Sequence, residues 1–252
     1  MSISIAVAGK GGTGKTSIAS LIIRYLKKNG LVPILAVDAD ANANLGESLG
    51  LGTGKTIGSI LAAFNEEKTG IPPGLTKEAY LEIKLNETIV ESQGLDLIAM
   101  GRGEGTGCYC YPNTVLKKFI DNLRGDYAYI VMDNEAGMEH LSRRTTEDID
   151  ELFIISDHSV KGVRTAARIR ELTSELKLLV KRQSVIINLV PDELDSHVIQ
   201  ELERLEIEPI ANIPLDKEVY QYDLEQRPLL ELPDNSKAVM AISKLMAKVL
   251  SR

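Results

Sequence analysis

Short runs of apolar and β-branched residues recur along the chain, and several of them end at an acidic or amide side chain. Runs of this kind predict buried strands of a parallel sheet whose carboxyl ends share one edge. They cover residues 3–8, 33–38, 95–100, 128–133, 151–156, 184–188 and 208–213. Helical signals lie between them, at residues 17–28, 56–68, 113–123, 157–177 and 235–250. This alternation predicts an α/β fold of three layers, with a mostly parallel central sheet flanked by helices on both faces.

Two segments give weaker patterns. Within residues 46–93, the turn signal Pro72-Pro73-Gly74 separates the helical stretch 56–68 from residues 77–91, which mix helix and strand signals. The stretch that begins at Pro214 and runs toward 223–227 predicts a loop. Because no Pro- or Ser-rich linker divides the 252 residues, we expect a single domain that spans residues 1–252.

Residues 9–16 read Gly-Lys-Gly-Gly-Thr-Gly-Lys-Thr and follow the first predicted strand directly. The pattern G-x-x-x-x-G-K-[ST] between a strand and a helix predicts a phosphate loop, because its glycines let backbone N–H groups face phosphate oxygens and the helix N-terminus adds partial positive charge. Lys15 is expected to reach the β- and γ-phosphates, and Thr16 to bind Mg²⁺. The fold is therefore expected to be that of a P-loop NTPase. The expected nucleotide-binding residues are Gly11, Gly12, Thr13, Gly14, Lys15, Thr16, Ser17 and Asn188.

The tail of this motif recurs in Gly54-Lys55-Thr56. Leu49 stands where the first glycine of a second phosphate loop would be required. We therefore expect this second stretch to form only the start of a helix.

Acidic side chains follow two of the predicted strands. Asp38 ends the run 33–38, which we expect to neighbour the phosphate-loop strand, and Asp40 lies two residues further on. These two carboxylates could merely cap the next helix. The functional alternative, which we favour, is that Asp38 helps to hold Mg²⁺ and Asp40 orients the attacking water. Asp133 ends the run 128–133 and is the expected second carboxylate on the Mg²⁺ side.

Two other features lie at predicted strand ends. Residues 134–141, which include Gly137, can form a switch loop near the γ-phosphate. Asn188 ends the run 184–188 and could simply form a turn, but its amide also matches the donor and acceptor edge of adenine.

The chain has two cysteines, Cys108 and Cys110, in a glycine-rich segment. A C-x-C pair is a weak signal, and two incidental thiols beside a turn are the alternative. Thiolates at this spacing can supply half of a four-sulfur metal site, and a symmetric homodimer would bring the second pair to the two-fold axis. Sulfur ligands favour Ni²⁺ or Zn²⁺ over Mg²⁺ or Ca²⁺.

Charge and composition narrow the class of function. The net charge is −7, with acidic and basic residues dispersed, which disfavours binding to nucleic acid. The N-terminus lacks the pattern of a secretory signal, and no stretch approaches the roughly 18 apolar residues of a membrane helix. We therefore expect a cytoplasmic chain without a membrane partner. The apolar stripe of the helix at 235–250 lacks bulky aromatic residues and predicts core packing rather than contact with a membrane surface.

Lys10 follows the first glycine of the phosphate loop, where the cradle itself does not require a lysine. With this residue the sequence K-G-G-T-G-K-T resembles the deviant Walker A loop of the ATPase family that includes MinD, ParA and the nitrogenase iron protein. The segments D-A-D-A-N-A-N-L and V-M-D-N-E-A-G-M-E-H, and then Asn188, follow in that family's order. The resemblance implies a homodimer that clamps ATP, in which Lys10 reaches the phosphates held by the partner subunit. By this analogy Lys10, Lys15 and Asp40 are the expected catalytic residues.

Within this family, the G-C-Y-C segment and D-N-E-A-G-M-E-H resemble the branch of CooC and AcsF, ATPases that assist the maturation of carbon monoxide dehydrogenase and acetyl-CoA synthase. The resemblance implies a nickel-insertion ATPase, with Cys108 and Cys110 holding Ni²⁺ or Zn²⁺ at the dimer interface. It also implies Mg²⁺ bound by Thr16, Asp38 and Asp133. The alternatives are a MinD- or ParA-like spatial regulator without a metal role, and an iron–sulfur reductase, whose cysteine spacing the chain does not match.

Overall fold

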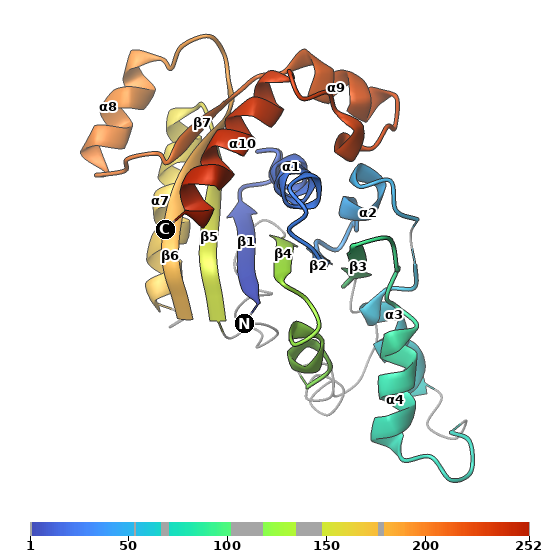
Figure 1. The fold of residues 1–252 in the computed structure, drawn as a ribbon. Coiled ribbons are helices and arrows are strands. Elements are labelled where there is room, and N and C mark those ends of the chain that lie inside the picture. The colour runs from blue at the N-terminus through green and yellow to red at the C-terminus, as the bar shows by residue number, and fades with distance from the viewer. Residues whose placement is uncertain are drawn as a thin grey trace.

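The sheet at the centre of the molecule has the predicted parallel arrangement. The computed structural model describes residues 2–52, 54–66, 71–101, 118–134, 148–175 and 179–251. Seven strands are hydrogen-bonded in the order β3-β2-β4-β1-β5-β6-β7, and every pair of neighbours is parallel (Figure 1). The strands are β1 (Ile3–Gly9), β2 (Ile34–Ala39), β3 (Leu95–Ala99), β4 (Tyr129–Asn134), β5 (Asp148–Asp157), β6 (Leu179–Val190) and β7 (Ala211–Pro214).

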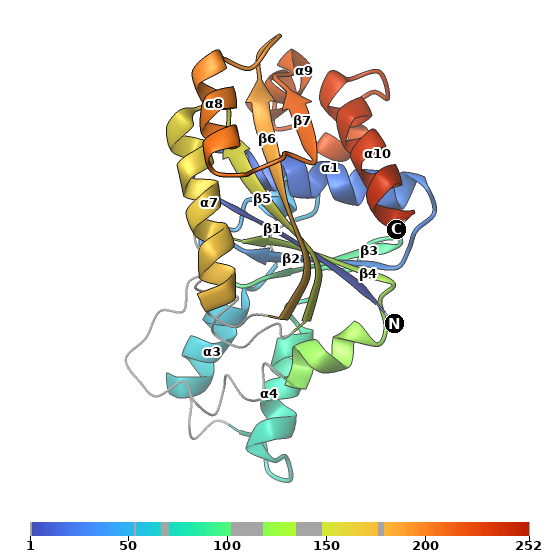
Figure 2. The same ribbon diagram turned by 90° about the vertical axis from the view of Figure 1, so that its left-hand side faces the viewer.

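Helices cover both faces of this sheet and give the three expected layers. The helices are α1 (Lys15–Lys28), α2 (Leu45–Ser48), α3 (Ile57–Glu66), α4 (Lys77–Asn86), α7 (Val160–Glu175), α8 (Ser196–Arg204), α9 (Lys217–Leu224), α10 (Lys237–Leu250) and the 3₁₀ helix η1 (Leu229–Glu231). Residues 118–124 are also helical. One core joins the sheet to α1, α2 and α10, and a second core joins the opposite face to α3, α4, α7 and α8 (Figure 2).

Alternating side chains of the central strands serve the two cores. In β5, Leu152 and Ile154 enter the core beneath α7, whereas Phe153 and Ile155 enter the core beneath α1 and α10. All four side chains are buried. A strand buried on both faces needs a continuous apolar run, which is why these runs were readable in the sequence.

The final helix packs into the core, as its pattern predicts. The stripe of α10 is buried and consists of Ala238, Val239, Ile242, Leu245, Met246 and Val249. Across the ranges that the structure describes, no helix has both the length and the apolar character needed to cross a membrane.

The position of β2 corrects one expectation. We expected the strand that carries Asp38 to neighbour β1, but β4 lies between them. The crossover through α1 skips one strand position, and the apolar β4 then fills the gap. Sequence order alone does not fix this spatial order.

Two polar segments have more regular structure than their sequence predicts. The expected loop after Pro214 contains α9, in which no residue is fully buried and only Val219 and Tyr222 pack partly buried against the core, so its apolar periodicity is too short to predict a helix. Strand β6 extends well before the predicted run 184–188. Its charged first half pairs with β5, because Arg182 and Ser184 donate hydrogen bonds of 2.8 and 2.9 Å to the buried carboxylate of Glu151.

Candidate nucleotide-binding site

The phosphate loop connects the central strand β1 to the amino end of α1. Gly14 is the N-cap of α1 and has left-handed backbone angles, with φ 82° and ψ 29°. Glycine adopts this conformation without steric cost, which allows the helix to begin directly at Lys15. The positive end of the α1 dipole therefore faces the loop, as a phosphate-binding site requires.

Hydrogen bonds within the phosphate loop hold its conformation. The backbone carbonyl of Lys10 accepts a bond of 2.8 Å from the Thr13 hydroxyl and a longer one of 3.4 Å from Nζ of Lys15. Lys15 is only 8% exposed, whereas Gly11 and Gly12 are exposed. The ammonium group thus rests against the loop backbone, close to where the motif places phosphate.

Gly9 fills a position where the loop passes very near to β5. A Cβ atom built on Gly9 would lie 2.4 Å from the carbonyl oxygen of Ile155. Gly9→Ala is therefore expected to destabilise the chain by about 1 to 3 kcal/mol, because backbone must shift to admit the methyl group. Gly11→Ala is the matched control, since a Cβ atom there meets nothing within 4 Å.

Urea unfolding of the nucleotide-free proteins measures both effects. The Gly11→Ala variant should unfold within about 0.5 kcal/mol of the parent chain. Equal losses of stability in the two variants would show that the contact with Ile155 is not what requires Gly9.

Two buried carboxylates meet beside the loop. Asp133 of β4 is directly opposite Val7 of β1 on one side and Asp38 of β2 on the other. The Thr16 hydroxyl donates a hydrogen bond of 2.5 Å to Oδ2 of Asp133. The structure therefore brings Thr16, Asp38 and Asp133 together at the carboxyl edge of the sheet, although β2 does not neighbour β1.

Burial makes these carboxylates difficult to ionise. The pKa of Asp133 is raised from 3.8 to about 7, mainly by burial, with Asp38 and Asp40 adding repulsion and the Thr16 hydrogen bond opposing the shift. The pKa of Asp38 is raised to about 6, again mainly by burial. Oδ1 of Asp133 is buried and has no hydrogen-bond partner among the residues that the structure describes. A cation here would offset the cost of two buried negative charges.

The chemistry of these groups fits Mg²⁺ with a nucleotide better than a cage built from protein ligands alone. Magnesium is usually bound through one or two carboxylates, a hydroxyl, water and substrate phosphates. In the described ranges, no three His, Cys, Asp or Glu side chains are grouped to hold a metal ion. Oδ1 of Asp133 has no partner within the described ranges and belongs to the carboxylate that accepts from Thr16, so it is the atom that such an ion would satisfy.

The structure also shows the capping role for Asp38. Its two oxygens accept hydrogen bonds from the backbone N–H groups of Leu45 at 2.8 Å and Asp40 at 3.1 Å. The half-buried Asp40 in turn accepts a bond of 2.8 Å from the N–H of Asn42. These contacts fix the loop before α2. The expected roles, Mg²⁺ binding by Asp38 and orientation of water by Asp40, stay predictions.

A pocket of about 200 Å³ adjoins the loop at the amino end of α1. Gly14, Ser17 and Asn188 line one side of it, so the structure places these three predicted residues together. Its lining also includes residues that were not predicted from the sequence, namely Pro214, Leu215, Val219, Tyr220 and Asp223. The strand-ending Pro214 and the capping Asp216 were the available signals, because they mark the turn from β7 into α9.

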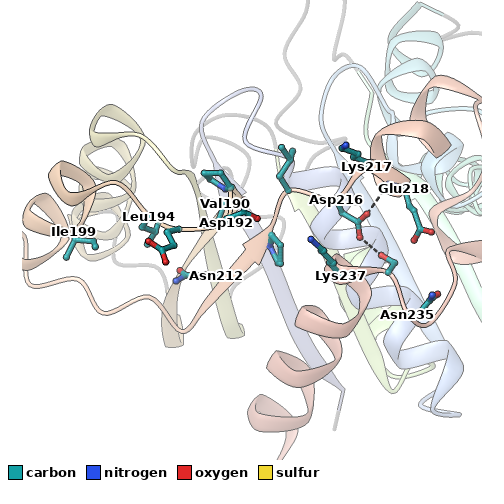
Figure 3. Close-up of a pocket in the computed structure, with 15 residues that line it drawn as sticks. Val190, Asp192, Leu194, Ile199, Asn212, Asp216, Lys217, Glu218, Asn235 and Lys237 are labelled. Carbon is teal, nitrogen blue, oxygen red and sulfur yellow. Dashed lines mark hydrogen bonds between the residues drawn. The ribbon is translucent and has the colours of Figure 1, made fainter.

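Asp216 lines both this pocket and a larger groove of about 1250 Å³, and Pro214 and Leu215 are shared in the same way. Figure 3 shows the residues that line the larger groove. Its carboxylate accepts hydrogen bonds from the Glu218 N–H and the Ser236 hydroxyl, at 2.9 and 2.7 Å, and from the Ala238 N–H at 3.0 Å. One side chain thus caps α9 and ties it to the start of α10. The groove is lined by residues from 190–199, 212–218 and 235–237, and none of its lining residues belongs to the phosphate loop.

Several predicted residues lie outside the described ranges. Cys108 and Cys110 belong to 102–117, and most of the expected switch at 134–141 belongs to 135–147. Residues 113–117, the start of the helix expected at 113–123, also belong to 102–117. The second motif tail is described and forms a helix start, as expected: Thr56 precedes α3 and its hydroxyl accepts a bond of 3.2 Å from the Ser59 N–H.

This combination of features defines the class of the protein. A parallel sheet with the phosphate loop after its central strand, and a loop threonine bonded to an aspartate on the adjacent strand, make it a P-loop NTPase fold of the MinD and ParA type. The family follows from the sequence, since residues 4–229 match the CobQ/CobB/MinD/ParA nucleotide-binding domain. The chain belongs to this family.

Individual relatives agree with this assignment. An ATP-binding protein of Methanocaldococcus jannaschii is 42% identical over 250 residues, which cover 98% of each chain. The carbon monoxide dehydrogenase accessory protein CooC of Rhodospirillum rubrum is 27% identical over 233 residues, covering 88% of this chain and 87% of CooC. The solved structure of the septum site-determining protein MinD from Pyrococcus horikoshii, complexed with Mg-ADP, superposes with a TM-score of 0.71 at 19% identity, covering 99% of this chain and 96% of that one.

Proposed function

We propose that the chain is a magnesium-dependent ATPase that converts ATP and water to ADP and phosphate. The observation that carries this proposal is the contact of Thr16 with Asp133 beside the phosphate loop, with one carboxylate oxygen buried and unpartnered among the described residues. Two buried carboxylates, whose ionisation costs free energy, lie next to a loop whose motif binds phosphate. Such a site suits a triphosphate with a bound metal ion.

Each residue of the loop has a distinct part in this proposal. Backbone N–H groups of residues 11–14 face the phosphate oxygens, and Lys15 leaves the Lys10 carbonyl to bind the β- and γ-phosphates. Thr16, Asp38 and Asp133 hold the metal, and Asp40 orients the attacking water. When bound, Mg²⁺ supplies neutralisation of charge on the transferred phosphoryl group.

The pocket beside Gly14 is the proposed nucleoside site. Ser17 and Asn188 line it, and its volume of about 200 Å³ lies against the amino end of α1. Its wall from β7 and α9 combines apolar side chains with the carboxylate of Asp223. Such a pocket suits a flat base with one polar edge.

Phosphate release from ATP, with Mg²⁺ and with EDTA, tests the proposed activity. Lys15→Ala should abolish hydrolysis, and Lys55→Ala is the matched control. Lys55 occupies the equivalent place in the second motif tail, but its ammonium forms an exposed ion pair of 2.9 Å with Glu87. Hydrolysis that survives in Lys15→Ala, or that needs no Mg²⁺, would contradict the proposal.

The further role that we propose is that of a nickel metallochaperone. ATP binding would join two subunits and bring Cys108 and Cys110 of each together around one Ni²⁺ or Zn²⁺ ion. The C-x-C segment and the similarity to CooC support this role, and they favour carbon monoxide dehydrogenase or acetyl-CoA synthase as the client. Loss of the γ-phosphate would then loosen the metal site.

Metal titration under anoxic conditions tests this role. The parent chain should bind about one Ni²⁺ or Zn²⁺ ion per dimer, more tightly with ATP, because four thiolates complete a soft-metal site. The double variant Cys108→Ala and Cys110→Ala should lose this binding and keep its ATPase activity. If the double variant binds as much nickel as the parent chain, the metal role is wrong.

The second candidate is a spatial regulator that cycles on a membrane or on DNA. It is supported by the family itself, which includes MinD and ParA. Co-sedimentation with liposomes and with DNA, each in the presence of ATP, distinguishes the two candidates. The metallochaperone should remain in the supernatant in both assays, and ATP-dependent pelleting in either would favour the regulator.

A further inference from the structure

The side chain of Asn188 joins the phosphate loop to the neighbouring nucleoside pocket. It is 4% exposed, and its Nδ2 donates a hydrogen bond of 2.8 Å to the backbone carbonyl of Thr13. A carbonyl oxygen can only accept, so the amide nitrogen must face the loop. One N–H group of Asn188 is therefore already engaged with the protein before any base is bound.

The loop backbone fits tightly around this amide. A Cβ atom on Gly14 would lie 2.4 Å from Nδ2 of Asn188, and φ of Gly14 is +82°. The peptide that joins Thr13 to Gly14 thus passes directly against the side chain. Because a trans peptide is planar, a hydrogen bond that fixes the Thr13 carbonyl also turns the Gly14 N–H in the opposite direction.

Strand β6 is distorted where it presents Asn188. The pairing of β6 with β7 shifts register between Ile187 and Val190, and Leu189 has a left-handed φ of 57°. This conformation is unfavourable for leucine and persists only where the surroundings impose it. The distortion therefore lies at the residue that follows Asn188, beside both the loop and the pocket.

We propose that Asn188 is a positioning residue of the phosphate loop. It holds the Thr13–Gly14 peptide in its phosphate-binding orientation even when no base is bound, and it couples the nucleoside pocket to that peptide. The inference rests on the proposed nucleotide-binding function. It differs from the role expected from the sequence, in which the amide only recognises adenine, because it predicts an effect on ligands that have no base.

Inorganic tripolyphosphate separates the two roles, because it offers the phosphates of ATP without the nucleoside. Calorimetric titration with Mg²⁺ should show that Asn188→Ala weakens binding of ATP and of tripolyphosphate by the same factor, about tenfold, since the Thr13 carbonyl loses its buried donor. Asn188→Asp keeps the shape but sets a carboxylate oxygen against the carbonyl, so it should weaken both ligands further.

Tyr220→Ala is the matched control, because Tyr220 lines the same pocket from α9 and makes no contact with Thr13 that the structure records. It should weaken ATP and leave tripolyphosphate unchanged. Circular dichroism identifies any variant that fails to fold, and Asn188→Asp then carries the comparison, since it conserves side-chain volume.

The outcomes are distinct. Weaker binding of ATP alone in the Asn188 variants would overturn the proposal and leave only base recognition. A parent chain that binds ATP but not tripolyphosphate would also overturn it, because the loop would then not be preformed. If the parent chain binds neither ligand, the proposed nucleotide-binding function itself fails.

Discussion

Asp133→Asn is expected to stabilise the magnesium-free chain at pH 8 by about 2 kcal/mol and to lower magnesium-dependent ATP hydrolysis roughly 100-fold. The Asp133 side chain is 1% exposed, and burial raises its pKa to about 7. Its ionised form is therefore costly in the absence of a cation. The neutral amide removes that cost and also removes the ligand charge on which metal binding depends.

The sign of the pH dependence follows from this shift. The folded chain binds more protons at Asp133 than the unfolded chain between pH 3.8 and about 7. Asp133 alone should therefore lower the free energy of unfolding of the parent chain by about 4 kcal/mol as the pH rises through this window, and its contribution should then level off. Asp38, with a pKa of about 6, steepens the lower part of the fall. Asp133→Asn removes this cost of about 4 kcal/mol at pH 8, but about half of the gain in stability is lost again. The loss arises because the NH₂ group of the amide replaces an oxygen without a recorded hydrogen-bond partner, and it is then buried without one.

Urea unfolding in EDTA at pH 5 and pH 8 measures this effect. The advantage of Asp133→Asn should be small at pH 5 and largest at pH 8. Asp192→Asn is a suitable control, because Asp192 is exposed and its charge does not contribute to the raised pKa of Asp133. Parallel pH profiles for Asp133→Asn and the parent chain would contradict the assigned cost of the buried carboxylate.

Lys10→Ala is expected to lower the rate of ATP hydrolysis by about 1,000-fold, which is the size of effect typical of a positive charge supplied across a dimer interface. The hydrogen bonds within the loop use the backbone carbonyl of Lys10, and alanine keeps that carbonyl. The substitution should therefore leave the loop intact while removing the ammonium group that the partner subunit would receive.

Mixing two inactive variants tests whether Lys10 acts on the partner. A dimer of Lys10→Ala with Asp40→Ala contains one complete site, built from Asp40 of the first subunit and Lys10 of the second. An equimolar mixture should recover about a quarter of the parent rate, because half of random dimers are mixed and each has one working site. A rate equal to the sum of the separate rates would refute the trans role.

Much of this architecture is predictable because its strands are buried on both faces. Ile154 and Ile155 of one strand belong to opposite cores, so the apolar run is continuous and its type is clear from the sequence. The phosphate loop is equally clear, because close backbone approaches dictate its glycines. The meeting of Asp38 and Asp133 followed from the rule that parallel strands end at a common edge.

Other features depend on contacts that are remote in the sequence. Nothing local indicates that β4 inserts between β1 and β2, or that the charged start of β6 pairs with β5 through Glu151. Likewise α9 has only two side chains, Val219 and Tyr222, that pack partly buried against the core, so its apolar signal is weak and the wall that it forms for the pocket was missed. The hydrogen bond from Asn188 to Thr13 joins residues 175 positions apart and became visible only in three dimensions.

Asp216 caps α9 and ties it to the start of α10, at the edge of the pocket that a nucleotide is proposed to enter. None of the residues of α9 is fully buried, and only Val219 and Tyr222 pack partly buried against the core, so separation of α9 would expose less apolar surface than separation of α10. The Asp216 carboxylate accepts hydrogen bonds from Glu218 of α9 and from Ser236 and Ala238 at the start of α10. It therefore links α9 to a helix that is firmly packed in the core. We therefore expect α9, which forms one wall of the proposed nucleoside pocket, to separate from the body at a lower free-energy cost than any strand of the sheet.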